Sequence, residues 1–213
     1  MRTIMVINAK GGCGKSTLST NIAAYFATHW EGTVTLADYD PQASSLDWLA
    51  KRPPERDRIH GLDAHEEGLR HLDRNTEFLI IDAPARSHGT ELTQLVRHAE
   101  TIVVPVLPSP IDINAASRFI QELLDVGKVE RREVKVAAVA NRVRENLLIF
   151  GELEQFLEKI KVPFIARLRD AQNYIRAYSR GLGVHELPEY LAYPDWEQWE
   201  PLVKWLESRR SQP

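Results

Sequence analysis

The chain has 213 residues, of which 43% are hydrophobic and 27% charged, an ordinary composition for a globular protein with one sizeable core. The net charge of −3 argues against a uniformly basic nucleic-acid-binding protein, and the single cysteine excludes an internal disulfide or a cysteine-rich metal site within one chain. The chain enters a predicted strand at once and no apolar run approaches the ~18 residues of a membrane span, so we expect one cytoplasmic α/β domain over residues 1–213.

The charge is unevenly distributed along the chain. Residues 128–180 carry 12 basic and 7 acidic side chains, whereas the segments before and after them are acidic overall. A basic segment within an acidic protein favours one positively charged face.

A glycine-rich segment at residues 8–17 lies between an apolar run at residues 3–7 and a helical pattern that begins at Leu18. Such a turn points backbone N–H groups and the positive end of a helix dipole at one small volume, which favours a phosphate. A turn without a ligand is the alternative, but the glycines, the lysines and the paired hydroxyls together favour phosphate binding. We interpret Cys13 as a packing residue at a position where only a small side chain fits. The predicted phosphate-binding residues are Gly11, Gly12, Cys13, Gly14, Lys15, Ser16 and Thr17.

The strict Walker A spacing fails at Ala9, and a second lysine, Lys10, follows it. The segment Lys-Gly-Gly-x-Gly-Lys-Ser-Thr resembles the deviant Walker A motif of the ParA/MinD family of ATPases. The resemblance implies ATP and Mg²⁺ as cofactors, with Lys15 on the phosphates and Ser16 on the metal. It also implies that Lys10 reaches the partner's phosphates across a homodimer with ATP sandwiched between the protomers.

A second strand, predicted over residues 33–37, leads into Asp38-Tyr-Asp-Pro-Gln42 at the edge of the sheet where ligands bind. Asp40 is suited to cap a helix predicted over residues 41–49. The segment also resembles the A′ motif of ParA proteins, which implies that Asp40 helps to place the hydrolytic water. Asp38 is then expected to support the metal shell.

Residues 50–76 are the least regular part, with a strand predicted near residues 59–64 and a helix through Leu69 and Leu72. Residues 78–82 form an apolar strand that ends in Asp82, the Walker B arrangement, so we expect Asp82 to hold the magnesium shell near Ser16. The ParA/MinD family continues with Asp-x-Pro-Pro, whereas this chain has Ala85 in place of the second proline.

Further strands are predicted at residues 101–106, 134–140 and 163–166, and helices through Leu92 and Val96 and over residues 113–126 and 147–160. The helix at 113–126 follows a proline-rich link that resembles the family's segment leading to the dimer face. Asn141 and Arg142 follow the strand at 134–140 and resemble the adenine-reading position of MinD-like ATPases, although Asn141 also suits a plain turn. Apolar strands that alternate with helices predict a doubly wound, mostly parallel sheet flanked by helices.

Three arginines in the basic segment, Arg169, Arg176 and Arg180, are spaced seven and four residues apart, compatible with one face of a helix. A solvated face is the plain interpretation. The segment also resembles the C-terminal part of ParA proteins, which implies DNA binding without sequence preference.

The last predicted helix carries three tryptophans but also several acidic residues, and Pro201 is expected to limit one continuous helix. MinD ends in a membrane-targeting helix, but the acidic face here would be repelled by anionic lipid, so we expect the helix to dock on the sheet.

The motifs occur in the order typical of the ParA/MinD family, and the chain is similar to the small ParA type. The resemblance implies a nucleoid-associated ATPase that partitions or positions a plasmid, chromosome or protein cargo, with hydrolysis stimulated by a ParB-like or cargo-adaptor protein. A metabolic ATP-dependent ligase on the same core and a MinD-like membrane-associated ATPase are the alternatives.

Overall fold

The computed structural model describes residues 1–131, 133–144, 150–159 and 162–213. Its centre is a seven-stranded sheet of order β3-β2-β4-β1-β5-β6-β7 in which neighbouring strands run parallel. The strands are β1 (Arg2–Val6), β2 (Thr33–Asp38), β3 (Ile59–Asp63), β4 (Thr76–Asp82), β5 (Thr101–Val106), β6 (Lys135–Val143) and β7 (Phe164–Arg169).

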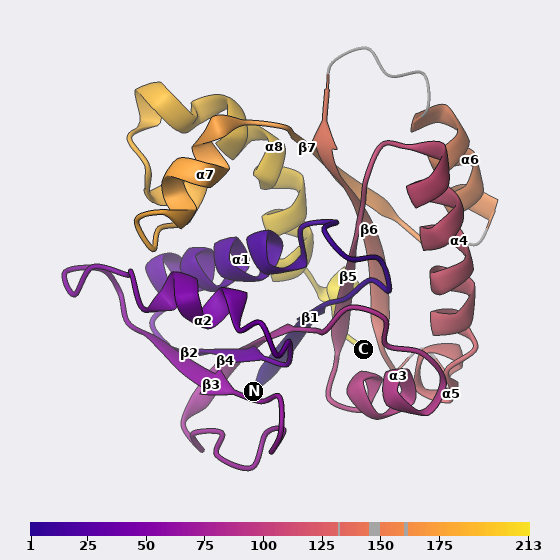
Figure 1. The fold of residues 1–213 in the computed structure, drawn as a ribbon, viewed down its shortest axis with the longest axis horizontal. Helices are drawn as coiled ribbons and strands as arrows, with labels where there is room; N and C mark the ends of the chain where they lie inside the picture. The colour runs from indigo at the N-terminus through magenta and orange to yellow at the C-terminus, as the bar shows by residue number, and fades with distance from the viewer. Residues whose placement is uncertain (132, 145–149, 160–161) are drawn as a thin grey trace.

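Helices cover both faces of this sheet (Figure 1). One face carries α1 (Lys15–His29), α2 (Ser44–Leu49), α7 (Gln172–Tyr178) and α8 (Glu189–Glu207), and the other carries α3 (Gly89–Val96), α4 (Pro110–Leu124), α5 (Gly127–Glu130) and α6 (Phe150–Lys159). Short 3-10 helices, η1 (Val184–Glu186) and η2 (Arg209–Ser211), precede and follow α8. The predicted doubly wound parallel sheet is confirmed.

Each face of the sheet buries its own apolar cluster. Along β1 and the residue after it, Ile4 and Val6 join the cluster under α1 and α8, while Met5 and Ile7 join the cluster under α3 and α4. Strands that are apolar on both faces are what a parallel sheet sandwiched between helices requires.

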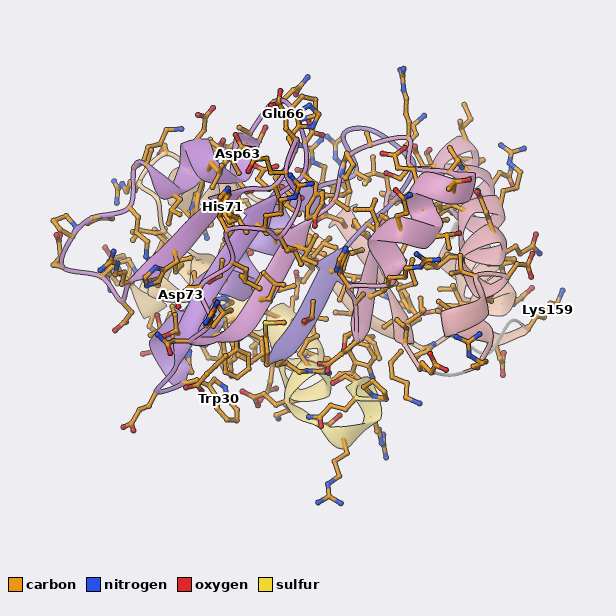
Figure 2. All side chains as sticks on the ribbon, turned by 90° about the horizontal axis from the view of Figure 1, so that it is seen from below. Trp30, Asp63, Glu66, His71, Asp73 and Lys159 are labelled. Atoms are coloured by element: carbon orange, nitrogen blue, oxygen red, sulfur yellow. The ribbon has the colours of Figure 1, made fainter. Side chains whose placement is uncertain are left out.

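The loop after β1 lies where the direction of winding reverses. The chain passes from β1 through α1 to β2 on one side, and from β4 through α3 to β5 on the other. Ligands bind outside the carboxyl ends of the strands at such a switch point, so the fold places residues 8–17 where a ligand is expected. Figure 2 shows the two ends of the strands, with Glu66 at the carboxyl end and Trp30, after α1, at the opposite end.

Two local predictions were wrong, and a third is confirmed only within the described residues. Residues 65–70 form turns, so the helix expected through Leu69 and Leu72 is absent from the described structure there. The short helix after β2 begins at Ser44, not at Pro41. The helix predicted over 147–160 is described as α6, Phe150–Lys159; residues 145–149, 160 and 161 lie outside the described residues.

The last helix is continuous through Pro194 and Pro201, contrary to the prediction. Both prolines are exposed, and the residues four positions before them, Tyr190 and Glu197, are exposed too. The carbonyl groups that lose a helical N–H partner therefore face water, which reduces the penalty of each proline.

The three arginines of the basic segment do not share a helix. Arg169 is the last residue of β7, Arg176 lies in α7, and Arg180 follows that helix. The strand extends to Arg169 because Ala166 and Leu168 are buried at strand spacing, a period of two that overrides the helical spacing of the arginines.

The apolar side of α8 docks on the sheet, as predicted. Trp199, Leu202 and Leu206 are buried in the cluster shared with α1 and β7. Within the described ranges, no helix is both long and apolar enough to cross a membrane.

Candidate functional site

The loop between β1 and α1 depends on two glycines in the left-handed region of the backbone. Gly12 has φ of 74° and Gly14 has φ of 97°, and Gly14 is the residue before the first turn of α1. A Cβ on Gly14 would also collide with the side-chain amide of Asn141. The glycine pattern is therefore required by backbone conformation and by a close approach from β6.

The loop's interior is built around Lys15. This side chain is only 8% exposed, and its Nζ donates to the carbonyl oxygen of Lys10 at 3.5 Å. Cys13 Sγ lies 3.2 Å from the same oxygen, and burial raises the pKa of this thiol. Cys13 thus fills space under the loop, as predicted, while Lys15 holds a positive charge where a bound phosphate would need it.

Asp82, at the end of β4, is buried beside this loop. Its Oδ1 accepts from Ser19 Oγ at 3.2 Å, while Oδ2 is buried and has no hydrogen-bond partner among the residues that the structure describes. Burial, assisted by the charge of Asp38, raises the pKa of Asp82 to about 7, although Ser16 and Lys15 oppose that change. A buried carboxylate oxygen without a donor fits a hydrated divalent cation, so Ser16 and Asp82 suit Mg²⁺.

Asp38 has a task that the sequence did not indicate. Its Oδ2 accepts from Ser45 N at 2.9 Å and from Ser45 Oγ at 2.6 Å, and its Oδ1 accepts from Asp40 N at 2.9 Å. The carboxylate therefore satisfies the free N–H groups that begin α2. No local spacing marks this contact, because Asp38 and Ser45 lie seven residues apart across a turn.

Contrary to the prediction, Asp40 does not cap α2. The residue before α2 is Ala43, with φ of 50°, and Asp40 Oδ1 instead accepts from Gln42 N at 3.0 Å. Asp40 stays half-buried at the carboxyl edge of the sheet, and its role in placing a water remains a prediction.

Asn141 and Arg142 lie within β6, not after it. Asn141 is buried, donates through Nδ2 to Cys13 O at 2.8 Å, and accepts from Arg142 N at 3.0 Å. A pocket of about 290 Å³ adjoins these two residues and Thr17, with Tyr174 and Tyr178 on its wall. The amide thus clamps the loop and also borders a space with aromatic walls that suits a planar base; adenine reading by Asn141 and Arg142 remains a prediction.

Lys10 points away from Lys15. Its side chain is 44% exposed, and its Nζ lies 3.5 Å from Asp112 Oδ1 in the first turn of α4. Ser109, which caps α4, donates to the other oxygen of Asp112. The spacing Ser-x-x-Asp is a helix-start signal from which Asp112 could have been singled out.

Arg169, the first predicted DNA contact, is engaged inside the protein. Its Nε donates to Asp195 Oδ1 at 2.6 Å and its Nη2 to Asp195 Oδ2 at 3.1 Å, and Asp195 is fully buried. Arg176 and Arg180 are exposed, as a DNA contact requires. The structure thus separates one arginine that joins β7 to α8 from two that face solvent.

Comparison with known proteins agrees with this geometry. Residues 4–184 match the family described as CobQ/CobB/MinD/ParA nucleotide binding domain. "Maintenance of carboxysome distribution protein A" of Halothiobacillus neapolitanus is 30% identical over 191 residues, covering 87% of each chain.

Solved structures share the fold. The ATP complex of a variant of McdA from Cyanothece has a TM-score of 0.73 at 15% identity and covers 95% of this chain and 96% of that one. The MinD cell division protein of Aquifex aeolicus has a TM-score of 0.69 at 18% identity, with 96% and 97% covered. With its glycine-rich loop, buried lysine and buried Asp82 in place, this chain belongs to the CobQ/CobB/MinD/ParA family of nucleotide-binding domains, as a ParA/MinD-type ATPase.

Proposed function

We propose that this ATPase is a dimerising switch that binds DNA without sequence preference in its ATP state and positions a cargo. The observation that carries the proposal is that two lysines of one loop have different surroundings. Lys15 is buried at the loop's centre, whereas Lys10 extends from it toward the start of α4. One cation serves the nucleotide of its own chain, and the other is available to a second copy.

In this proposal the loop N–H groups, Lys15 and Thr17 hold the phosphates, and Ser16 and Asp82 hold the magnesium shell. When bound, Mg²⁺ neutralises charge on the phosphate oxygens. Asp40 orients the water, and Lys10 of each protomer stabilises the charge that develops on the partner's nucleotide. Asp38 acts indirectly, by positioning Asp40, because its oxygens accept hydrogen bonds from the start of α2 and from the backbone of Asp40.

Dimerisation also explains how weak DNA contacts become useful. Arg176 and Arg180 lie on the exposed side of α7 and the turn after it, close to the pocket beside Asn141. Two copies on one surface raise the effective concentration of the second site, and phosphate contacts add in affinity. Hydrolysis then separates the copies and releases the DNA.

The cargo we propose is a large protein assembly, in place of a plasmid or chromosome, with an adaptor protein that stimulates hydrolysis. The support is the relative named for carboxysome distribution, which matches this chain over most of both lengths. Association with the nucleoid follows from the proposed DNA binding.

The test is retention of the full chain on DNA with ATP, with ADP and without nucleotide, as salt is raised. We expect retention only with ATP, and a steep loss of affinity with salt. An Arg176→Ala/Arg180→Ala variant should bind ATP normally and lose retention. The matched control is Arg70→Ala/Arg74→Ala, which removes the same charge from two exposed positions before β4. Absence of binding at low salt with ATP would sink the DNA part of the proposal.

An ATP-dependent ligase remains the second candidate because of one pocket. A space of about 520 Å³ at the carboxyl ends of β2 and β4 is lined by Tyr39, Pro41, Pro84 and Ala85 among others. The Tyr39 hydroxyl is buried there and meets no hydrogen-bond partner in the described part of the chain. Phosphate release that requires an added carboxylic acid, and is lost in Tyr39→Phe, would favour this candidate over the switch.

A further inference from the structure

A third pocket, far along α1 from the phosphate-binding loop, is not used by the proposed switch. It measures about 330 Å³ and lies between the C-terminal half of α1 and the exposed side of α8, which run on the same face of the sheet in Figure 1. We call it the α1–α8 pocket. Its lining is aromatic and acidic: Tyr25, His29, His185, Tyr193, Trp196, Glu197, Trp199, Glu200 and Val203.

The aromatic rings form one continuous wall. Tyr25 stacks on His29 with centroids 4.2 Å apart, and its ring meets His185 at 5.2 Å in an edge contact. His185 in turn meets Trp199 at 5.5 Å with the ring planes at 89°. Trp199 is only 1% exposed and lies behind the wall, whereas the half-buried Tyr25 and Trp196 and the exposed Tyr193 can contact a ligand in the pocket.

Hydrogen bonds with Asn21 hold His185 and the neighbouring Val184 in place. His185 Nε2 donates to Asn21 O at 3.2 Å, and Asn21 Oδ1 accepts from Val184 N at 2.7 Å. Asn21 Nδ2 donates to Thr17 O at 2.7 Å in the first turn of α1. The pocket is therefore preformed, so a ligand does not have to order it on binding.

The rim of the pocket is negatively charged. Glu197 and Glu200 line it, and Glu207 accepts from the Tyr25 hydroxyl at 2.8 Å. Lys204 pairs with Glu200 at 2.7 Å, on the exposed surface, and so offsets one of the three carboxylates. Burial lowers the pKa of His185 to about 4, so that this ring stays neutral near pH 7 and adds no opposing charge to the wall.

We propose that the α1–α8 pocket binds the side chain of an arginine or lysine presented by a basic segment of a partner protein. An aromatic wall attracts a cation through its π faces, and arginine also stacks flat on such rings. The carboxylates at the rim supply charge complementarity and hydrogen-bond acceptors for the donors of the cation. The same carboxylates repel nucleic-acid phosphates and anionic lipid, which disfavours DNA or a membrane as the occupant.

This site is distinct from the nucleotide site and does not depend on the proposed DNA binding. Tyr25 lies ten residues beyond Lys15 along α1, about 15 Å at the helical rise of 1.5 Å per residue. The pocket therefore remains accessible while the phosphate-binding loop is occupied.

The test uses the full chain with ADP and a synthetic peptide of alternating arginine and glycine, followed by tryptophan fluorescence and calorimetry. We expect saturable binding, lost for the same peptide with citrulline in place of arginine. A Glu197→Gln/Glu200→Gln variant should bind about tenfold more weakly, since a cation loses both its charge partners and part of its hold on the rings. Tyr193→Ala, an exposed position, should weaken binding without affecting the fold.

The matched control is Glu66→Gln/Glu189→Gln, which removes the same charge from exposed positions outside the pocket. It should leave the affinity unchanged. Equal weakening in both double variants would mean attraction to overall charge, and equal binding of the citrulline peptide would mean that no cation is recognised. Self-association of the chain through this surface, or binding of anionic vesicles that the pocket variants abolish, would likewise overturn the proposal.

Discussion

Two lysines five residues apart have opposite environments, and this difference between residues defines the site. Lys15 is enclosed by the loop and touches the carbonyl of Lys10, whereas the side chain of Lys10 reaches Asp112 on another element. Residue type alone does not separate these roles. The structure does, because Lys15 is 8% exposed whereas the side chain of Lys10 is 44% exposed.

Replacement of Lys10 by alanine should therefore affect assembly and not nucleotide binding. We expect Lys10→Ala to bind ATP with nearly unchanged affinity but to remain monomeric with ATP, which size-exclusion chromatography with light scattering would measure. Lys15→Ala, which empties the loop's interior, should lose nucleotide binding altogether. An ATP-dependent dimer that persists in Lys10→Ala would remove the proposed role in trans.

The neutral His185 gives the chain a measurable pH dependence. Burial, together with the charge of His29, lowers the pKa of His185 to about 4, while the Asn21 carbonyl and Glu186 oppose this shift. The unfolded chain binds a proton at its ordinary pKa of about 6.5, so it holds more protons than the folded chain between about pH 6.5 and pH 4. Stability is therefore full above pH 6.5 and falls as the pH is lowered through that window, by on the order of 3 kcal/mol.

Urea unfolding of the wild type and of His185→Gln at pH 7.5 and at pH 5 would measure this effect. The glutamine retains a donor for the Asn21 carbonyl and does not titrate. The difference in free energy of unfolding between the two proteins should narrow at pH 5. A constant difference between the two pH values would show that His185 titrates normally in the folded chain.

At the scale of elements, an ion pair between the half-buried Arg169 and the fully buried Asp195 joins β7 to α8. Asp195 is fully buried in α8 and accepts from Arg169 on β7 and, through Oδ2, from Asn173 Nδ2 at 2.7 Å. One carboxylate thus holds three elements together, because Asn173 belongs to α7. This network also explains why the basic segment divides between a strand and a short helix.

Removal of that carboxylate should destabilise the protein strongly. We expect Asp195→Ala to lower the free energy of unfolding by about 3 kcal/mol, since it leaves the Arg169 guanidinium and the Asn173 amide without their acceptor. Urea denaturation would measure it, with Glu189→Ala, exposed in the same helix, within about 0.5 kcal/mol of wild type. Equal stability of the two variants would contradict a structural role for the pair.

At the scale of the whole molecule, the two ends of the chain meet at the edge of the sheet where β1 and β5 begin. Arg2 Nη2 donates to the carbonyl oxygen of Ser211 at 2.8 Å and to its hydroxyl at 2.7 Å, and Thr101 Oγ1 donates to the same carbonyl. The start of β1, the start of β5 and the last turn after α8 are therefore connected. Apolar contacts of the tryptophans hold α8 on the sheet, and these polar contacts fix the segment that follows its C-terminal end.

Deletion of residues 209–213 should consequently weaken the whole fold. Arg2 and the buried Thr101 lose an acceptor, so we expect the free energy of unfolding to fall by about 2 kcal/mol, with a lower melting temperature in calorimetry. Ser211→Ala, which keeps the backbone carbonyl, should cost less than the deletion. A melting temperature that the deletion leaves unchanged would mean that this contact does not contribute to stability.

Local patterns in the sequence were sufficient to predict the sheet, the glycine-rich loop between β1 and α1, and the acid at the end of β4. Each of these rests on local spacing: apolar strands of five to nine residues, glycines beside a helix start, and Asp82 directly after an apolar run. Local spacing fixes backbone conformation and the face that is buried, and these suffice to place the loop at the edge of a parallel sheet.

The partners of the polar side chains, by contrast, depend on the tertiary fold. Asp38 holds α2, Asn141 clamps the loop at Cys13, Arg169 pairs with Asp195, and Lys10 rests on Asp112. Three of these contacts join residues more than 25 positions apart, and the contact of Asp38 spans a turn that its spacing does not mark. A buried charged or amide group bonds to whichever group the folded chain places beside it. Hydrophobic periodicity in the sequence does not identify that partner.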